Sequence, residues 1–222
     1  MSGIRTANSE RTRTLAITGI MCGITILLSF PFVGTIPLFA VSATVAFLPA
    51  LVATMTLGLT PGLTVATVAG VASWLRNLTI PATLLSPYFM NPLVSVLPRM
   101  LIAITVWLCF KGLMAMPLPK AMDRMPLTVG ISAAIGSATN TAAVLGSLYL
   151  YYAVPFFADG RPLFAFHAPP LANQLYGAGI ENTVTVFLFG IVSTNGVAEL
   201  IINTLLATVL VLTLRNAKFS KL

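Results

Sequence analysis

The chain has 222 residues, of which 57% are hydrophobic and only 8% are charged. Soluble domains carry about 25% charged residues, so this composition predicts that most of the chain lies in a lipid bilayer. A net charge of +7 is also typical of nucleic-acid-binding proteins. The basic residues gather at the chain ends and in one loop rather than on a face with aromatic residues, which excludes that class.

Six apolar stretches predict an all-α membrane protein with six transmembrane helices, because a spanning helix needs about 20 apolar residues. We place these helices at residues 14–30, 39–57, 63–80, 93–113, 127–152 and 192–214, in a single membrane domain over residues 1–222. Pro49 predicts a kink in the second helix, and Thr60-Pro61-Gly62 predicts a turn after it. A long loop, residues 153–191, separates the fifth and sixth helices.

The distribution of basic residues predicts the orientation of the chain. Six spans place both termini on one side of the membrane, and nine of the twelve Lys and Arg residues fall on that side: Arg5, Arg11, Arg13, Lys111, Lys120, Arg124, Arg215, Lys218 and Lys221. Because loops rich in Lys and Arg stay in the cytoplasm, both termini are predicted to be cytoplasmic and the 153–191 loop external.

Two opposite charges, Arg99 and Glu199, lie inside predicted spans. A charge in a spanning helix costs roughly 3 kcal/mol, so it usually faces a pore, a partner or a ligand. Both residues lie about seven residues into helices that run inward, on the order of 10 Å below the outer edge. Two interpretations remain open: the side chains form a structural ion pair, or they contact a ligand.

Other polar residues predict a cavity around these charges that opens to the outside. Asn195, Glu199 and Asn203 recur every fourth residue and form one stripe on the sixth helix. Asn140 lies deeper, on the fifth helix, where the alternative role is an interhelical hydrogen bond. Asn91 lies at the expected mouth of a small-molecule site with apolar walls.

The outer rim supplies three further candidates. Trp74 and Arg76 lie at the outer end of the third predicted helix, either as rim groups of the cavity or as interface anchors. Tyr88 precedes the fourth helix and offers a ring on which a flat ligand can stack.

The first predicted helix carries a face of small residues. Ala16, Gly19 and Gly23 fall on one side of the helix, and Gly19 and Gly23 form a GxxxG pattern that lets another helix approach closely. The partner is either another helix of this chain or a second protein.

The sequence lacks a phosphate-binding loop, an HExxH or GxSxG motif and a Cys/His cluster. We therefore predict no catalytic residue, no metal and no cofactor. A stand-alone secondary transporter would carry ion-coupling residues and repeated halves, and neither is visible. A site on the outside without an energy source indicates a subunit that depends on an energised partner.

Three stretches resemble the substrate-binding S-components of energy-coupling factor (ECF) vitamin transporters. They are YFMNPLVSVLPR from Tyr88 to Arg99, GSATNT from Gly136 to Thr141, and NGVAELIINT from Asn195 to Thr204. The resemblance implies a multi-pass protein of the prokaryotic plasma membrane that captures a vitamin from outside with high affinity. It also implies that the loops at residues 31–38, 81–91 and 153–191 close over the ligand.

The resemblance further implies the partners. The first helix would dock on a transmembrane coupling protein through Ala16, Gly19 and Gly23, and two ABC-type ATPases would drive that protein. The family's motif is often written with alanines four apart, whereas Ala16 is followed by Ile20, so the glycines carry the spacing here.

Among S-components, the stretch that ends at Arg99 is most similar to pantothenate-type members. Arg99 would bind the carboxylate of pantothenate, and Asn140, Asn195 and Asn203 would bind its hydroxyl and amide groups. The alternatives within the family are hydroxymethylpyrimidine and pyridoxine. These would stack on aromatic residues such as Tyr88 and Trp74 and use Glu199 as an acceptor.

Overall fold

The computed structural model describes residues 2–38, 41–80, 88–116, 124–148, 150 and 196–217. The whole of the predicted external loop and the first residues of the sixth predicted helix, Asn195 included, lie outside this part of the chain.

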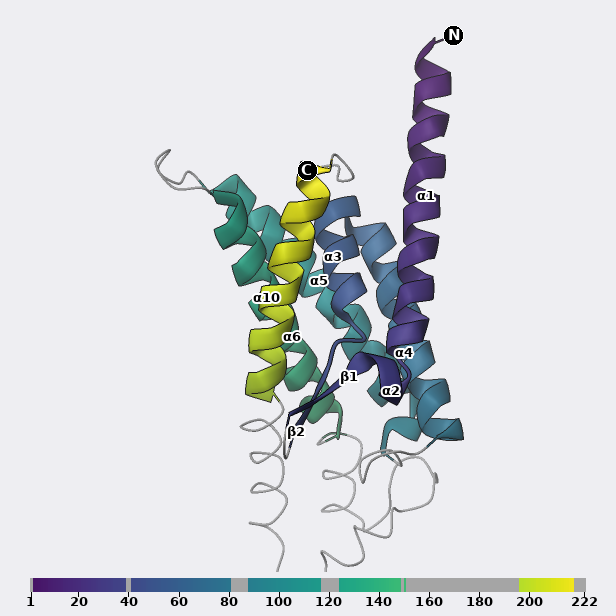
Figure 1. The fold of residues 1–222 in the computed structure, drawn as a ribbon, viewed down its shortest axis with the longest axis vertical. Helices are drawn as coiled ribbons and strands as arrows, with labels where there is room; N and C mark the ends of the chain where they lie inside the picture. Colours follow the sequence, from purple (N-terminus) through teal and green to yellow (C-terminus); the bar gives the residue numbers. More distant parts are fainter. Residues whose placement is uncertain are drawn as a thin grey trace, which may run out of the picture.

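The described residues form a helical bundle with one β-hairpin. In chain order the elements are α1 (Ser2–Leu28), α2 (Pro31–Gly34), β1 (Thr35–Leu38), β2 (Val41–Thr44), α3 (Leu48–Leu57), α4 (Leu59–Thr79), the 3-10 helix η1 (Tyr88–Met90), α5 (Pro92–Ala115), α6 (Arg124–Leu148) and α10 (Val197–Asn216). The long helices run side by side, and α2 and the hairpin lie at the end of the bundle opposite the marked termini (Figure 1).

Four of the described helices are long and apolar enough to cross a membrane: α1 over Ser9–Leu28, α5, α6 and α10. They correspond to the first, fourth, fifth and sixth predicted spans. Helix α4 has the length, 21 residues, but it is not in this group because Arg76, Asn77 and several threonines lower its hydropathy. The structure thus supports a membrane protein, and the count of six spans stays a prediction.

The prediction of one helix over residues 39–57 is wrong. Residues Val41–Thr44 are a strand that pairs with β1 in antiparallel register, and α3 begins only at Leu48. Pro49 lies in the first turn of α3 instead of kinking a longer helix. Proline is well suited to a first turn, where its missing N–H removes no helical hydrogen bond. Ten residues of helix span about 15 Å, half of a hydrocarbon core.

The break between α3 and α4 lies at Gly58 and not at the predicted Thr60-Pro61-Gly62 turn. Gly58 has φ 103°, a backbone conformation that is almost restricted to glycine. Thr60, Pro61 and Gly62 instead form the first turn of α4. A proline at the start of a helix therefore gave a misleading turn signal.

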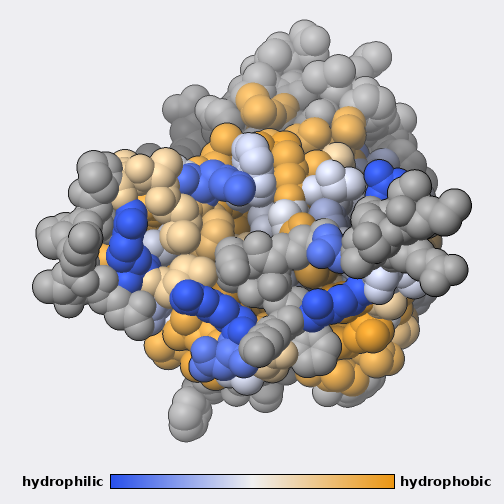
Figure 2. Space-filling model, turned by 90° about the horizontal axis from the view of Figure 1, so that it is seen from above, coloured by the Kyte–Doolittle hydropathy of each residue, from blue (hydrophilic) through white to orange (hydrophobic). Residues whose placement is uncertain are grey.

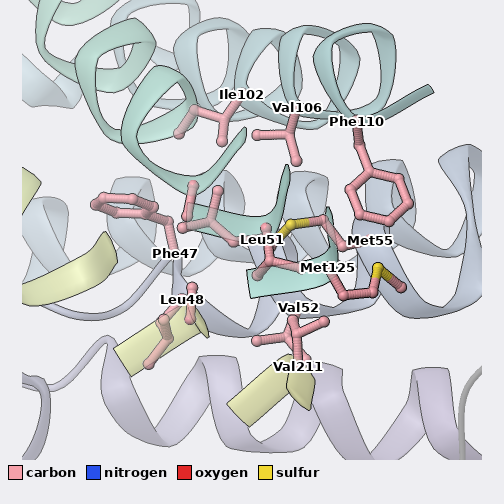
Figure 3. Close-up of a cluster of buried hydrophobic side chains, with 13 residues drawn as sticks. Phe47, Leu48, Leu51, Val52, Met55, Ile102, Val106, Phe110, Met125 and Val211 are labelled. Atoms are coloured by element: carbon pink, nitrogen blue, oxygen red, sulfur yellow. The ribbon is translucent and has the colours of Figure 1, made fainter. Parts of the chain in front are cut away.

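Helix α3 is the centre of the bundle, and nine of its ten residues are buried. Its apolar side chains meet Ile102, Val106 and Phe110 of α5, together with residues of α6 and α10 (Figure 3). Lipid tails are as apolar as these side chains, so close packing rather than escape from water holds the helices together.

Two glycines allow neighbouring helices to approach closely. A Cβ atom on Gly70 of α4 would lie 2.7 Å from the Val96 Cα atom of α5. A Cβ atom on Gly136 of α6 would lie 2.6 Å from Leu51 of α3. The position of α4 against α5 therefore requires glycine at residue 70, whereas a Cβ atom at residue 136 would force the Val106 and Leu51 side chains to shift.

The first residues of α1 and the last residues of α10 lie at the same end of the bundle (Figure 1). Viewed from this end, hydrophilic residues are spread over the described surface between apolar flanks (Figure 2). This arrangement agrees with two termini on one side. The assignment of that side to the cytoplasm stays a prediction.

We expect Gly58→Ala to lower the free energy of unfolding by about 1–3 kcal/mol, because alanine at this positive φ is strained. A Cβ atom there meets no neighbour, so the loss would report the backbone alone. Thermal unfolding in detergent measures the effect. The matched control is Gly112→Ala, an exposed site within α5, which should gain about 0.5–1 kcal/mol. Equal stability of the two variants would contradict the argument.

Candidate functional site

The polar stripe of α10 binds the end of the hairpin. Glu199, in the first turn of α10, accepts a hydrogen bond from the Thr44 N–H with an O–N distance of 3.0 Å. Asn203, one turn further, donates from Nδ2 to the Thr44 carbonyl at 3.2 Å and to the Glu199 carbonyl at 2.9 Å. Both backbone groups of the last residue of β2 are therefore held by α10 side chains. Asn195, the third member of the predicted stripe, lies outside the described residues.

Asn140 of α6 reaches the same place from the neighbouring helix. Its side chain interacts with the Glu199 carboxylate, which brings together three of the residues predicted to share a site. Two buried amide oxygens here, Oδ1 of Asn140 and Oδ1 of Asn203, have no hydrogen-bond partner. A buried acceptor without a partner costs about 1–3 kcal/mol, so a bound donor would stabilise this region.

Arg99 lies on α5, close to the start of the helix and next to Pro98. Its guanidinium lies 5.6 Å from the centre of the Phe89 ring of η1, in a cation–π contact. Its Nη1 atom is buried and has no hydrogen-bond partner. The charges of Glu199 and Arg76 act on it from nearby, but within the described part of the chain no ion pair joins Arg99 to Glu199. Arg99 is therefore a partly buried cation with a buried Nη1 donor that has no partner.

Two residues predicted at the rim and mouth of the cavity, Trp74 and Asn91, form hydrogen bonds within the protein. Trp74 donates from its indole N–H to the Met90 carbonyl at 2.8 Å, which ties η1 to α4. Asn91 is the N-cap of α5, and its Oδ1 accepts from the Leu93 N–H at 3.0 Å. Tyr88 begins η1, and its side chain lies outside what the structure describes. Trp74 and Asn91 therefore help to position the segment that carries Phe89, whose ring contacts Arg99.

Sequence reasoning missed two residues that shape this region. Thr44 is the hairpin residue that Glu199 and Asn203 bind. Ser95 donates its hydroxyl to the Phe89 carbonyl at 2.6 Å and so fixes η1 on α5. Both contacts use a main-chain partner, and neither residue type nor spacing signals such a contact.

Arg76 lies near the end of α4, on the side that faces α1. Its Nη1 and Nη2 atoms are 3.5 Å from the Ser29 carbonyl and from Asn77 Oδ1, and its Nε atom is buried without a partner. A cavity of about 340 Å³ lies beside it, between α1 and α4. The cavity predicted between the fourth, fifth and sixth spans would adjoin segments outside the described residues, and it stays a prediction.

The small-residue face of α1 points away from the bundle. Ala16, Gly19 and Gly23 are exposed, and a Cβ atom on either glycine would meet nothing within 4 Å. The opposite face of α1, with Thr18 and Thr25, is buried. No described helix of this chain uses the GxxxG pattern, which leaves it available to another protein.

Comparison with known proteins gives one family. The model of the family described as "ECF transporter, substrate-specific component" matches residues 13–211. No curated protein matches the chain.

We expect Glu199→Ala to destabilise the ligand-free protein by about 1–3 kcal/mol, because the Thr44 N–H would lose its acceptor. Glu199→Gln keeps an acceptor oxygen and should retain most of the stability. Thermal unfolding in detergent distinguishes the two. Glu10→Ala, at an exposed position of α1, is the control and should change stability by less than about 0.5 kcal/mol. If Glu199→Ala unfolds like Glu10→Ala, the hydrogen bond to Thr44 does not hold the hairpin.

Proposed function

The chain belongs to the family of substrate-specific components of ECF transporters, and from this premise we propose that it is a high-affinity binding subunit for pantothenate. Members of this family are small-molecule-binding subunits and not enzymes, and they work with a module made of a coupling protein and ATPases. The ligand, the residues that bind it and the docking face are our proposals.

The observation that carries the choice of ligand is the unpartnered Nη1 atom of Arg99. The Glu199 carboxylate accepts from the Thr44 N–H, and no ion pair joins it to Arg99 among the described residues. An anionic ligand would supply the paired counter-charge that Arg99 lacks there, and a carboxylate forms strong paired hydrogen bonds with a guanidinium.

The unpartnered amide oxygens of Asn140 and Asn203 match the donor groups of pantothenate. Pantothenate carries hydroxyl groups and an amide N–H, which are donors. Asn140 and Asn203 each present a buried oxygen without a partner. Binding would satisfy these acceptors and the Arg99 donor together, so the ligand would remove costs that the empty site bears. Asn91 and Trp74 would act indirectly, by positioning η1.

The alternatives are less well supported. A neutral ring such as hydroxymethylpyrimidine or pyridoxine would leave the buried Arg99 Nη1 donor without a charged partner. A stand-alone secondary transporter is disfavoured because the family works with an ATP-driven module.

We further propose that Ala16, Gly19 and Gly23 form the surface that docks on the coupling protein. Their exposure and the open space around both glycines support this role. Two ABC-type ATPases would act through the coupling protein. With four apolar helices of spanning length among its described residues, the protein would be a multi-pass component of a prokaryotic plasma membrane.

Arg99→Ala should weaken pantothenate binding at least about tenfold, because a hydrogen bond between charged groups contributes about 1.5–3 kcal/mol. Arg99→Lys keeps the charge without the paired donors and should give an intermediate affinity. Calorimetric titration of the detergent-purified protein measures both. Arg215→Ala, an exposed residue in the last turn of α10, is the control. Unchanged affinity in Arg99→Ala would remove this residue from the site, and binding of a neutral vitamin alone would reject pantothenate.

Gly23→Leu should leave ligand binding by the isolated subunit intact and abolish vitamin uptake by cells that also express the coupling protein and ATPases. A side chain at this position meets no other part of the described chain but would block close approach of another helix. Gly70→Leu is the contrasting variant, because it clashes with the α5 backbone and should lose both folding and binding. Normal uptake in Gly23→Leu would exclude this face from docking.

A further inference from the structure

The cavity between α1 and α4 opens on the outer surface of the bundle. Its walls are apolar and include Ile26 from α1, Phe30 just beyond the end of α1, and Val71 and Leu75 from α4. All four side chains are exposed by more than a third. In a membrane protein this surface faces lipid tails, so the volume of about 340 Å³ is a groove open to lipid.

One end of this groove carries a cation. Arg76 lines the cavity, and its Nε atom is buried without a hydrogen-bond partner. Its two contacts through Nη1 and Nη2 are both 3.5 Å long, the upper limit for a hydrogen bond. The nearby charge on Arg99 repels it, and among the described residues no carboxylate pairs with it. An anion at this position would satisfy donors that the protein leaves open.

The dimensions of the groove match one leaflet of a bilayer. Arg76 lies three residues before the last residue of α4, about 5 Å from the helix end. This depth is close to the headgroup region. The groove continues along α4 to Thr67, about 14 Å further into the membrane. A leaflet has about 15 Å of hydrocarbon, so the apolar part has room for one acyl chain.

We propose that this groove binds one anionic phospholipid, whose phosphate contacts the Arg76 guanidinium and whose acyl chain lies between α1 and α4. Apolar walls beside a single unpaired cation are complementary to an anionic amphiphile. A guanidinium is well suited to phosphate because it presents paired donors. The site is separate from the proposed vitamin site, which lies among α5, α6 and α10.

Native mass spectrometry of the vitamin-free protein in detergent tests the proposal. The protein is titrated with phosphatidylglycerol or with phosphatidylcholine of the same acyl chains. We expect wild type to bind one phosphatidylglycerol molecule about tenfold more tightly than phosphatidylcholine. Arg76→Gln should lose this preference, and Arg76→Lys should keep part of it. Equal binding of the two lipids by wild type, or an unchanged preference in Arg76→Gln, would overturn the proposal.

A second pair of variants separates the groove from the charge. Ala72 lines the cavity, so Ala72→Phe would fill it and should reduce binding of phosphatidylglycerol about tenfold while Arg76 remains. Leu78→Phe is the matched control on the same helix, at an exposed position outside the cavity lining, and should bind like wild type. If Ala72→Phe, folded by its thermal transition, bound the lipid as wild type does, the acyl chain would not occupy this groove.

Discussion

The need to give every buried main-chain polar group a partner governs this fold. The chain interrupts its helices with the hairpin β1–β2, and a buried main-chain group without a hydrogen bond is costly. The two strands pair with each other, and the Val45 N–H that follows them donates to the Gly34 carbonyl. The remaining groups of Thr44 are bound by Glu199 and Asn203. This contact holds α10 against the hairpin that precedes α3, and α3 shares a buried core with α5, α6 and α10.

The contact between Glu199 and Thr44 also bears on which groups of the candidate site remain unpaired. Glu199 binds the hairpin, so its carboxylate is not paired with Arg99 within the described chain. Arg99 instead lies over the Phe89 ring with one donor unpartnered, and the oxygens of Asn140 and Asn203 are likewise open. Glu199 thus holds the hairpin, while unpartnered hydrogen-bonding groups remain on α5, α6 and α10. Because β2 is held by residues that adjoin the site, a ligand that contacts Asn203 would also act on the hairpin.

Helix α1 has two faces with different chemistry. Its buried face uses small polar side chains, and Thr25 donates its hydroxyl to the Met21 carbonyl of its own helix, so no polar group is left open against the core. Its outer face presents Gly19 and Gly23 to open space. Just beyond the end of the same helix, Ser29 and Phe30 border the groove that holds Arg76. The proposed protein partner and the proposed lipid would therefore contact different parts of one helix.

The sequence alone determined the membrane class, the long helices α1, α5, α6 and α10, and the placement of Glu199 and Asn203 one turn apart on α10, because hydropathy and helical spacing are local properties. Tertiary structure decided the rest. An apolar run such as residues 41–57 is compatible with either a strand or a helix. The Thr44 N–H at the end of the strand has its acceptor on Glu199, 155 residues away. Whether Glu199 would bind Arg99 or the hairpin also depended on a main-chain N–H, a group that every residue except proline carries and that no sequence pattern can mark.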